Sequence, residues 1–275
     1  MSKARESFID EVEDSVEAIC ERLHQELSLG AEASTETAQR RVLILLDLNG
    51  LLVCRTKERL PLRQPDFIVP VGYRKQIPTY YYIRPFAREL VSCLLHDPRC
   101  EVAIYTSIMA KNMMPVLRAF DNYFKDMTAQ GTFEPIECDA SASGYIDSYD
   151  ESLSDTVIGL FDQPYNAPDP EGPNDWDTKR DLDLIWRVPK IRCQGFDHTN
   201  TLVIDAEERK VKDYRENALV VPEYDEVELR RPVHDRRVLM TLLGYLENTL
   251  FPNMQMSTEN TIAQILKKNP PRIET

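Results

Sequence analysis

The sequence predicts an α/β fold in which helices flank a parallel sheet. The main observation is three unbroken apolar runs of strand length, at residues 42–46, 102–105 and 201–204. Continuous apolar runs are typical of strands buried on both faces, as in a parallel sheet covered by helices. Helix-like stretches precede the second and third runs, at residues 86–95 and 181–186. This alternation of strand and helix is the second observation that favours the α/β class.

Length and charge limit the function classes. The 275 residues fit one large domain or two small ones, and they can form a core without disulfides. Asp and Glu number 46 against 33 Lys and Arg, which gives a formal charge of −13. Phosphate backbones and anionic lipids attract positive surfaces, so we expect no direct nucleic-acid binding. No apolar stretch approaches the roughly 18 residues of a membrane span, so we expect no membrane association either.

The cysteines and the N-terminal residues indicate a reducing compartment. None of the six cysteines lies in a C-x-x-C or other zinc-like spacing, and the four histidines are scattered. Residues 1–6 lead directly into acidic residues, without the apolar region of a secretory signal. We therefore expect reduced thiols and a cytoplasmic or nuclear location.

We divide the chain into three parts. Residues 1–39 are predicted to form an amphipathic helix and a linker, because apolar residues recur every three or four positions from 8 to 27. Residues 40–250 form the α/β domain, and residues 251–275 a C-terminal helix and tail. The helix at 8–27 either packs on its own domain or docks a protein partner, and the C-terminal helices are a second candidate surface for partners.

Two insertions are expected within the domain. Residues 54–82 contain four prolines among β-forming residues, which indicates a hairpin after the first strand. Residues 139–178 read as a loop-rich acidic insertion. The stretch 139–183 carries twelve acidic residues and two basic ones, so most of the net charge lies there. We interpret it as a partner surface or as a guard over a neighbouring site.

Polar residues follow each apolar run, at the strand ends where α/β sheets bind ligands. They are Asp47 and Asn49 after the first run, Thr106 after the second and Asp205 after the third. This set predicts phosphoryl transfer, in which an Asp carboxylate attacks phosphorus while Mg²⁺, a hydroxyl and a cation neutralise the phosphoryl oxygens. Asp47 would be the nucleophile, Thr106 the hydroxyl and Asp205 a metal ligand. Lys179 or a neighbour would be the cation.

The order of these segments resembles a known family. Residues 47–52 lie over the D-x-D-x-T/V motif of the haloacid-dehalogenase (HAD) superfamily. Residues 81–86, Tyr-Tyr-Ile-Arg-Pro-Phe, and residues 101–107, ending in Tyr-Thr-Ser, are similar to its branch of RNA polymerase II C-terminal-domain phosphatases, also called NLI-interacting-factor-like phosphatases. Residues 179–182 and 201–205 resemble its later motifs. The resemblance covers residues 40–250 and implies a HAD-like, Rossmann-type sheet.

Three residues depart from the pattern of this family. Asn49 stands where the second Asp acts as general acid and base, and an amide cannot exchange that proton near neutral pH. Ala206 stands where an Asp or Asn helps to hold Mg²⁺, and Leu51 replaces the usual Thr or Val. The resemblance implies metal ligands at Asp47, the Asn49 backbone carbonyl and Asp205, but with Mg²⁺ weakly held or absent. In the Lys-Arg-Asp-Leu segment, Arg180 is the obvious substitute for Lys179.

The departures lead us to expect a catalytically impaired or inactive phosphatase-like protein that acts as a binding or scaffold domain in a protein assembly. The alternative is an active Mg²⁺-dependent phosphatase, acting through an aspartyl-phosphate on phosphoprotein Ser/Thr or on a small phosphoester. A third interpretation is a dehalogenase, which uses the Asp nucleophile without metal. From another class, the chain would be chiefly an assembly subunit that makes its contacts through terminal helices.

Overall fold

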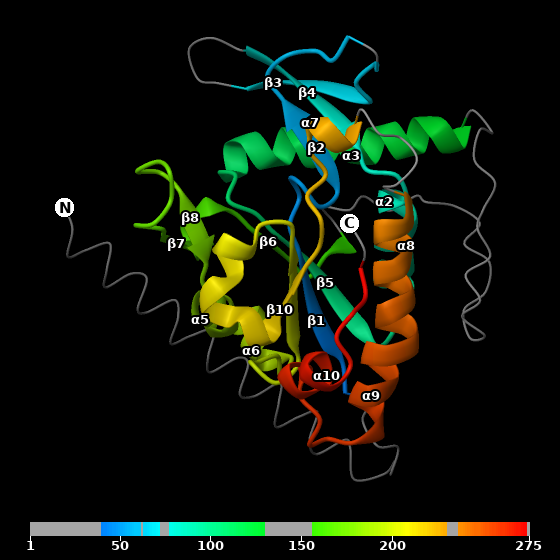
Figure 1. Cartoon of the computed structure of the whole chain (residues 1–275), viewed down its shortest axis with the longest axis vertical. Helices are drawn as coiled ribbons and strands as arrows, with labels where there is room; N and C mark the ends of the chain where they lie inside the picture. Colours follow the sequence, from blue (N-terminus) through cyan, green and yellow to red (C-terminus); the bar gives the residue numbers. More distant parts are fainter. Residues whose placement is uncertain (1–39, 62, 72–76, 130–155, 230–235, 274–275) are drawn as a thin grey trace.

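A five-stranded parallel sheet forms the centre of the computed structural model, which describes residues 40–61, 63–71, 77–129, 156–229 and 236–273. The amphipathic helix expected at 8–27 lies outside the described residues. The strand order is β10-β9-β1-β5-β6, and every neighbouring pair is parallel (Figure 1). The strands are β1 (Val42–Leu46), β5 (Cys100–Tyr105), β6 (Gly159–Phe161), β9 (Thr201–Asp205) and β10 (Ala218–Val220). The predicted fold class is confirmed.

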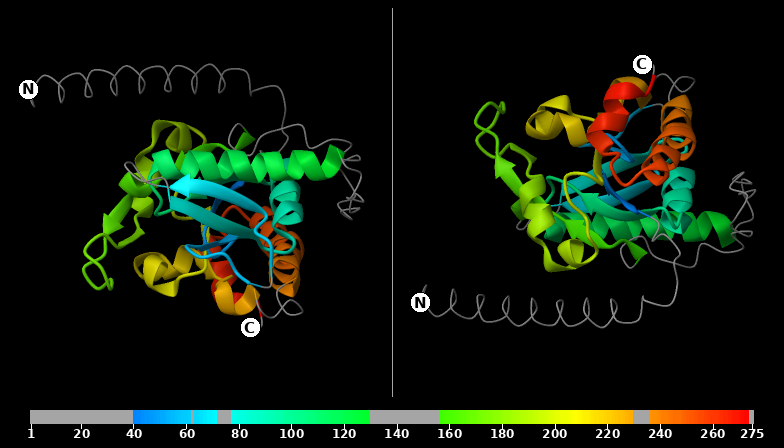
Figure 2. Two further views of the ribbon diagram at one scale, coloured as in Figure 1. Left: turned by 90° about the horizontal axis from the view of Figure 1, so that it is seen from above. Right: turned by 90° about the horizontal axis from the view of Figure 1, so that it is seen from below.

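The unbroken apolar run of β1 has a direct structural reason. All five of its side chains are fully buried, but successive side chains enter two separate cores. Ile44 packs with helices α2 (Ala87–His96), α3 (Ala110–Ala129) and α8 (Arg236–Tyr245) on one face. Leu43 and Leu45 pack with α5 (Leu182–Arg187) and α6 (Pro189–Cys193) on the other. Because successive side chains of the strand point into one core and then the other, all of them must be apolar. Figure 2 shows the helical layers on either side of the sheet.

The insertion after β1 is an antiparallel sheet at the top of Figure 1, as predicted. Its order is β2-β4-β3, with strands β2 (Val53–Thr56), β3 (Phe67–Val71) and β4 (Ile77–Ile83). Phe67 stacks on Tyr81 across the β3–β4 pair, with ring centroids 5.1 Å apart. Of the acidic insertion, residues 139–155 lie outside the described residues. The described part includes a two-stranded sheet of β7 (Asn166–Pro168) and β8 (Thr178–Arg180).

The C-terminal helices pack into the same core as the sheet. Four of their apolar side chains are almost fully buried in the core that contains Ile44: Phe251, Met254, Ile262 and Ile265. The remaining elements are 3₁₀ segments η2 (Gln163–Tyr165) and η3 (Glu208–Asn217), helices α7 (Glu226–Leu229), α9 (Phe251–Met256) and α10 (Ile262–Lys268), and the π-helical turn η4 (Leu246–Leu250). Within the described part of the chain, no helix has both the length and the apolar character that a membrane crossing needs.

Candidate functional site

The parallel sheet brings three of the expected site residues to one edge. Asp47 follows β1, Thr106 follows β5, and Asp205 is the last residue of β9. Since β1 lies between β5 and β9, all three side chains come from neighbouring strand ends. Their exposed fractions are only 1%, 1% and 0%. The chemistry-bearing residues therefore lie together in a place that water hardly reaches.

A glycine lets the turns after β1 and β9 approach each other closely. Gly50 has a φ of +83°, a backbone conformation that L side chains rarely adopt. A Cβ at this position would also lie 3.2 Å from the Ala206 Cβ and 3.2 Å from the Glu223 Cγ. The turn that carries Asn49 is thus held directly against the residue that follows Asp205.

Arg180 is the cation at the centre of the site. Its Nη2 lies 2.9 Å from Oδ1 of Asp47 and 2.7 Å from Oδ2 of Asp205, and its Nε donates to the same Asp205 oxygen at 2.7 Å. Its Nη1 donates to Oδ1 of Asn166 at 3.1 Å, and its guanidinium lies 4.7 Å from the ring centroid of Tyr105. The side chain is fully buried. We call Asp47, Arg180 and Asp205 the buried cluster.

The two carboxyls of the buried cluster differ in their affinity for a proton. Burial opposes ionisation of Asp205, but the charges of Arg180 and Lys210 and a 2.8 Å hydrogen bond from the Glu207 amide outweigh it, so its pKa lies below the usual 3.8. Burial raises the pKa of Asp47 above 3.8, against the opposing charge of Arg180. Asp47 Oδ2 accepts no hydrogen bond from any described residue. The negative charge of Asp205 also raises the pKa of Asp47, and the charges of Arg180 and Lys210 with the Leu48 amide hydrogen bond do not outweigh both effects.

The structure does not bring Lys179 into the buried cluster. Its ammonium pairs with Asp213 at the surface, whereas the next residue of β8, Arg180, faces the sheet ends. Successive side chains of a strand point to opposite faces, so only one of these two cations can reach the carboxylates. The substitute suggested by the sequence, the residue directly before Asp181, is therefore the one at the site.

Sequence reasoning missed a second cation, Lys210. It lies on η3 and is only 8% exposed. Its Nζ lies 2.5 Å from Oε1 of Glu207 and 4.0 Å from Oδ2 of Asp47. Burial disfavours its charge, but the nearby carboxylates of Asp47, Asp205 and Glu207 outweigh this, so its pKa is raised and it stays an ammonium. The available signal was the three-residue spacing of Glu207 and Lys210 just after the third strand.

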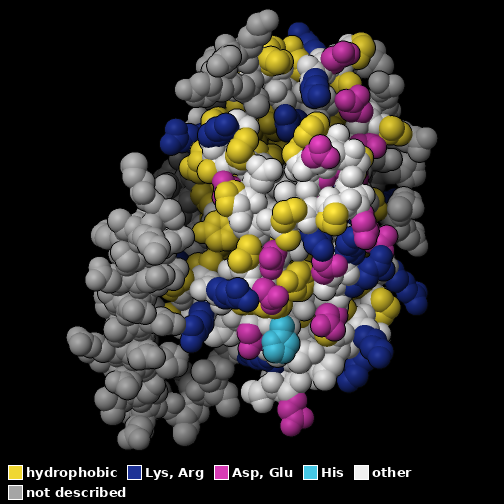
Figure 3. Space-filling model, turned by 90° about the vertical axis from the view of Figure 1, so that its left-hand side faces the viewer, with side chains coloured by type: hydrophobic (Ala, Val, Ile, Leu, Met, Phe, Trp, Pro, Cys, Tyr) yellow, Lys and Arg dark blue, Asp and Glu magenta, His cyan; other side chains and the backbone are white. Residues whose placement is uncertain are grey.

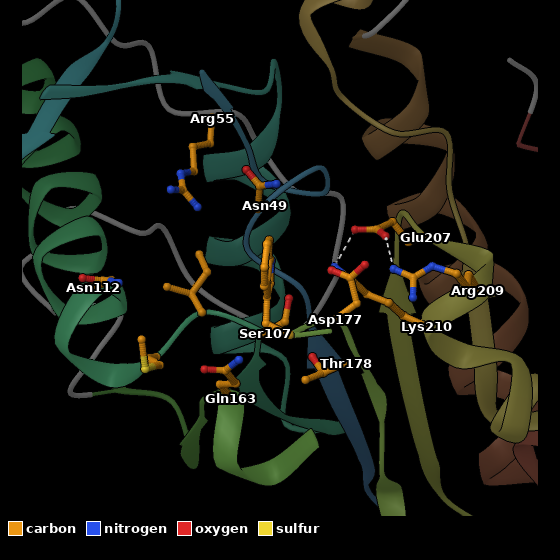
Figure 4. A pocket seen from close by; sticks show the side chains of 13 residues that line it. Asn49, Arg55, Ser107, Asn112, Gln163, Asp177, Thr178, Glu207, Arg209 and Lys210 are labelled. Atoms are coloured by element: carbon orange, nitrogen blue, oxygen red, sulfur yellow. Dashed lines mark hydrogen bonds and ion pairs between the residues drawn. The ribbon is translucent and has the colours of Figure 1, made fainter. Parts of the chain in front are cut away.

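A pocket of about 340 Å³ lies beside the buried cluster. Asn49 and Arg55 line one part of it, and Glu207, Arg209 and Lys210 line another (Figure 4). Of the described residues, neither Asp47 nor any other member of the buried cluster belongs to the lining. Oδ1 of Asn49 is buried and has no hydrogen-bond partner in the described part of the chain. The pocket therefore offers a ligand the Asn49 and Lys210 side chains rather than the Asp47 carboxylate.

The described part of the acidic insertion is paired with basic residues of η3. Asp169 forms an ion pair with Arg209, and Lys212 Nζ lies 2.5 Å from Oε2 of Glu171. On the face shown in Figure 3, Lys and Arg side chains alternate with Asp and Glu side chains over the described surface. Two acidic residues of the insertion, Asp169 and Glu171, are therefore matched by cations of η3.

A family model matches part of the chain. Residues 42–158 match the family model of NLI interacting factor-like phosphatases. This match, over somewhat less than half of the chain, supports the similarity to the C-terminal-domain phosphatase branch of the HAD superfamily that the motifs indicated. No curated protein sequence matches the chain.

Two solved structures are similar to this chain. One is the fission yeast RNA polymerase II CTD phosphatase Fcp1, in a variant bound to beryllium fluoride, with 13% identity and a TM-score of 0.44. The similar region covers 84% of this chain and 71% of the chain in that structure. The other, also Fcp1 and described as an essential RNA polymerase II CTD phosphatase, has 13% identity and a TM-score of 0.40, and covers 82% of this chain and 57% of that one.

Phosphatases of this type generally use Mg²⁺, which binds to carboxylate and carbonyl oxygens. The residues at the strand ends here do not fit such an ion well. Asp47 Oδ1 and Asp205 Oδ2 both face the guanidinium of Arg180, and Ala206 offers no side-chain oxygen. Among the described residues, no group of three His, Cys, Asp or Glu side chains is arranged to hold a metal.

Proposed function

We propose that this chain is a catalytically impaired or inactive phosphatase relative that acts as a binding or scaffold domain in a protein assembly. The observation that carries the proposal is the buried cluster. Arg180 pairs with both carboxylates, 2.9 Å from Asp47 and 2.7 Å from Asp205. For Asp47 to attack a phosphorus atom, it would have to reach a substrate from a position that is 1% exposed, with its negative charge already paired with Arg180.

The residues beside the buried cluster support the same proposal. A phosphatase of this type needs a group that donates a proton to the leaving oxygen, which typically contributes about 10²–10⁴ in rate. Asn49 lines the pocket at the corresponding position, and its amide cannot supply that proton. Glu207 also reaches the pocket, but its carboxylate is already paired with the ammonium of Lys210, 2.5 Å away.

The activity test compares four proteins on p-nitrophenyl phosphate and on a phosphoserine peptide, with Mg²⁺ present. They are the wild type, Asp47→Ala, the double variant Asn49→Asp/Ala206→Asp, and a triple variant that adds Arg180→Lys. We expect wild-type turnover to equal that of Asp47→Ala. We expect the triple variant to gain about 10²-fold or more, because Asn49→Asp restores the proton donor.

The opposite result would establish the alternative function. Wild-type hydrolysis at least as fast as that of the multiple variants, and abolished in Asp47→Ala, would show an active phosphatase that obtains its proton from another group. The binding role has its own measurement. Proteins that co-purify with the full chain should be retained equally by wild type and Asp47→Ala, whereas selective loss with the folded variant would show that the partner is held as a substrate.

A further inference from the structure

The ammonium group of Lys210 lies near the carboxylates of both Glu207 and Asp47. Its ammonium nitrogen is 2.5 Å from Oε1 of Glu207 and 4.0 Å from Oδ2 of Asp47. That Asp47 oxygen is the one that accepts no hydrogen bond from the described residues. The Lys210 ammonium is therefore the second positive charge beside Asp47, in addition to Arg180.

We infer that the ammonium group of Lys210 replaces the divalent cation of this site, so that Mg²⁺ does not bind beside Asp47 while Lys210 is present. The inference rests on the proposed function, because it concerns the same carboxylates, but it makes a separate claim about metal binding.

The accessible oxygens are the first argument. A divalent ion such as Mg²⁺ takes hard oxygen ligands, usually from one or two carboxylates. In the buried cluster, one oxygen of Asp47 and one of Asp205 pair with Arg180. Lys210 contacts Glu207 and lies near the remaining oxygen of Asp47, and the remaining oxygen of Asp205 accepts from the Glu207 amide. Each of the three carboxylates therefore already has a cation beside it.

The balance of charge is the second argument. Asp47, Asp205 and Glu207 contribute three negative charges, and Arg180 and Lys210 contribute two positive ones. The field that would attract a divalent ion is thereby largely cancelled at short range.

The burial of Lys210 is the third argument. Its residue is 8% exposed, and it lines the pocket on the side of Glu207, as Figure 4 shows. An ion that entered from the pocket would have to displace the ammonium group and break its ion pair with Glu207. The Lys210 side chain is 10% exposed and that of Glu207 32%, so displacement would leave the lysine charge largely buried without its partner, which is costly.

The experiment measures Mn²⁺ binding by electron paramagnetic resonance and Mg²⁺ binding by calorimetry, on the full chain. It compares the wild type with Lys210→Met and with the matched control Lys212→Met. Lys212 lies on the same element, η3, and pairs with Glu171, so both variants lose one positive charge. We expect no saturable site in the wild type or in Lys212→Met. We expect Lys210→Met to gain a saturable site, with an apparent affinity at least about tenfold higher than any metal binding by those two proteins. Asp47→Ala in that background should remove the site.

Saturable binding to the wild type that is lost in Asp47→Ala would overturn the inference, as would equal affinities of Lys210→Met and Lys212→Met. If Lys210→Met does not fold, Lys210→Gln, which keeps a hydrogen-bond donor, replaces it, and the wild-type titration decides in any case. The two proposals fail separately. Metal binding by a wild type without turnover overturns only this inference, whereas metal-independent turnover that requires Asp47 overturns only the proposed function.

Discussion

The domain pairs carboxylates with cations in two opposite surroundings. The buried cluster of Asp47, Arg180 and Asp205 has side chains that are at most 1% exposed. The surface pair of Lys212 and Glu171 has side chains that are 25% and 74% exposed. Water solvates an exposed charge when its partner is removed, but a buried charge is left unsolvated. Changes to the buried cluster should therefore strongly affect the stability and the chemistry of the domain, whereas changes to the surface pair should affect them little.

The largest expected effect comes from Arg180→Met, which leaves two carboxylates buried without their cation. We expect the free energy of unfolding to fall by about 3–5 kcal/mol at neutral pH, the usual result of breaking a buried ion pair. Urea titration followed by circular dichroism measures it. Without Arg180 the pKa of both carboxyls is expected to rise, so the variant should regain stability as the pH falls and they become protonated. A loss below about 1 kcal/mol would show that the buried cluster contributes no more to stability than an exposed ion pair does.

A second prediction separates the two carboxylates. Asp205 has a lowered pKa, so its ionised form stabilises the fold above pH 3.8 and this contribution is lost as the pH falls through the folded-state pKa. Asp205→Asn should therefore lose about 2–3 kcal/mol at pH 7, the order of a charged hydrogen-bond partner.

Asp47→Asn should behave in the opposite way. The raised pKa of Asp47 means that the folded state disfavours its charge once the pH exceeds 3.8. The neutral amide should then leave stability at pH 7 unchanged or increased, and any gain should disappear below pH 3.8, where the carboxyl is itself neutral. Urea titrations of both variants at pH 7 and near pH 3.5 test this difference. Equal losses for both variants at pH 7 would contradict it.

The smallest effect is expected for Lys212→Ala. Its ion pair with Glu171 is exposed, and such pairs contribute about 1 kcal/mol or less. The change should also shrink in high salt, which screens exposed charges. Thermal unfolding of wild type and variant at low and high salt measures both points. A loss as large as that of Arg180→Met would show that exposure does not separate the two sets.

Local patterns predicted the sheet well and the helices less evenly. The runs at 42–46, 102–105 and 201–204 became β1, β5 and β9, because a strand buried on both faces must be apolar at every position. The 20-residue helix α3 was not predicted. Pro115 lies inside it, which argues against a helix at this point, yet Met113, Val116, Leu117 and Phe120 recur at helical spacing and are almost fully buried. The helix-breaking signal of one proline is outweighed here by the burial of an apolar helix face.

The candidate site also has features that the sequence predicts and features that depend on tertiary packing. By itself, the sequence determined that Asp47, Thr106 and Asp205 lie at one edge of the sheet, since parallel strands end together, and that Asn49 and Ala206 lack the functional groups of the family. Only the tertiary structure decided which cation joins them. Lys179 and Arg180 are adjacent in the chain, and the pleat of β8 turns one to the surface and the other to the carboxylates. Lys210 reaches Asp47 only because η3 packs beside the strand ends, a contact between distant segments that no local pattern encodes.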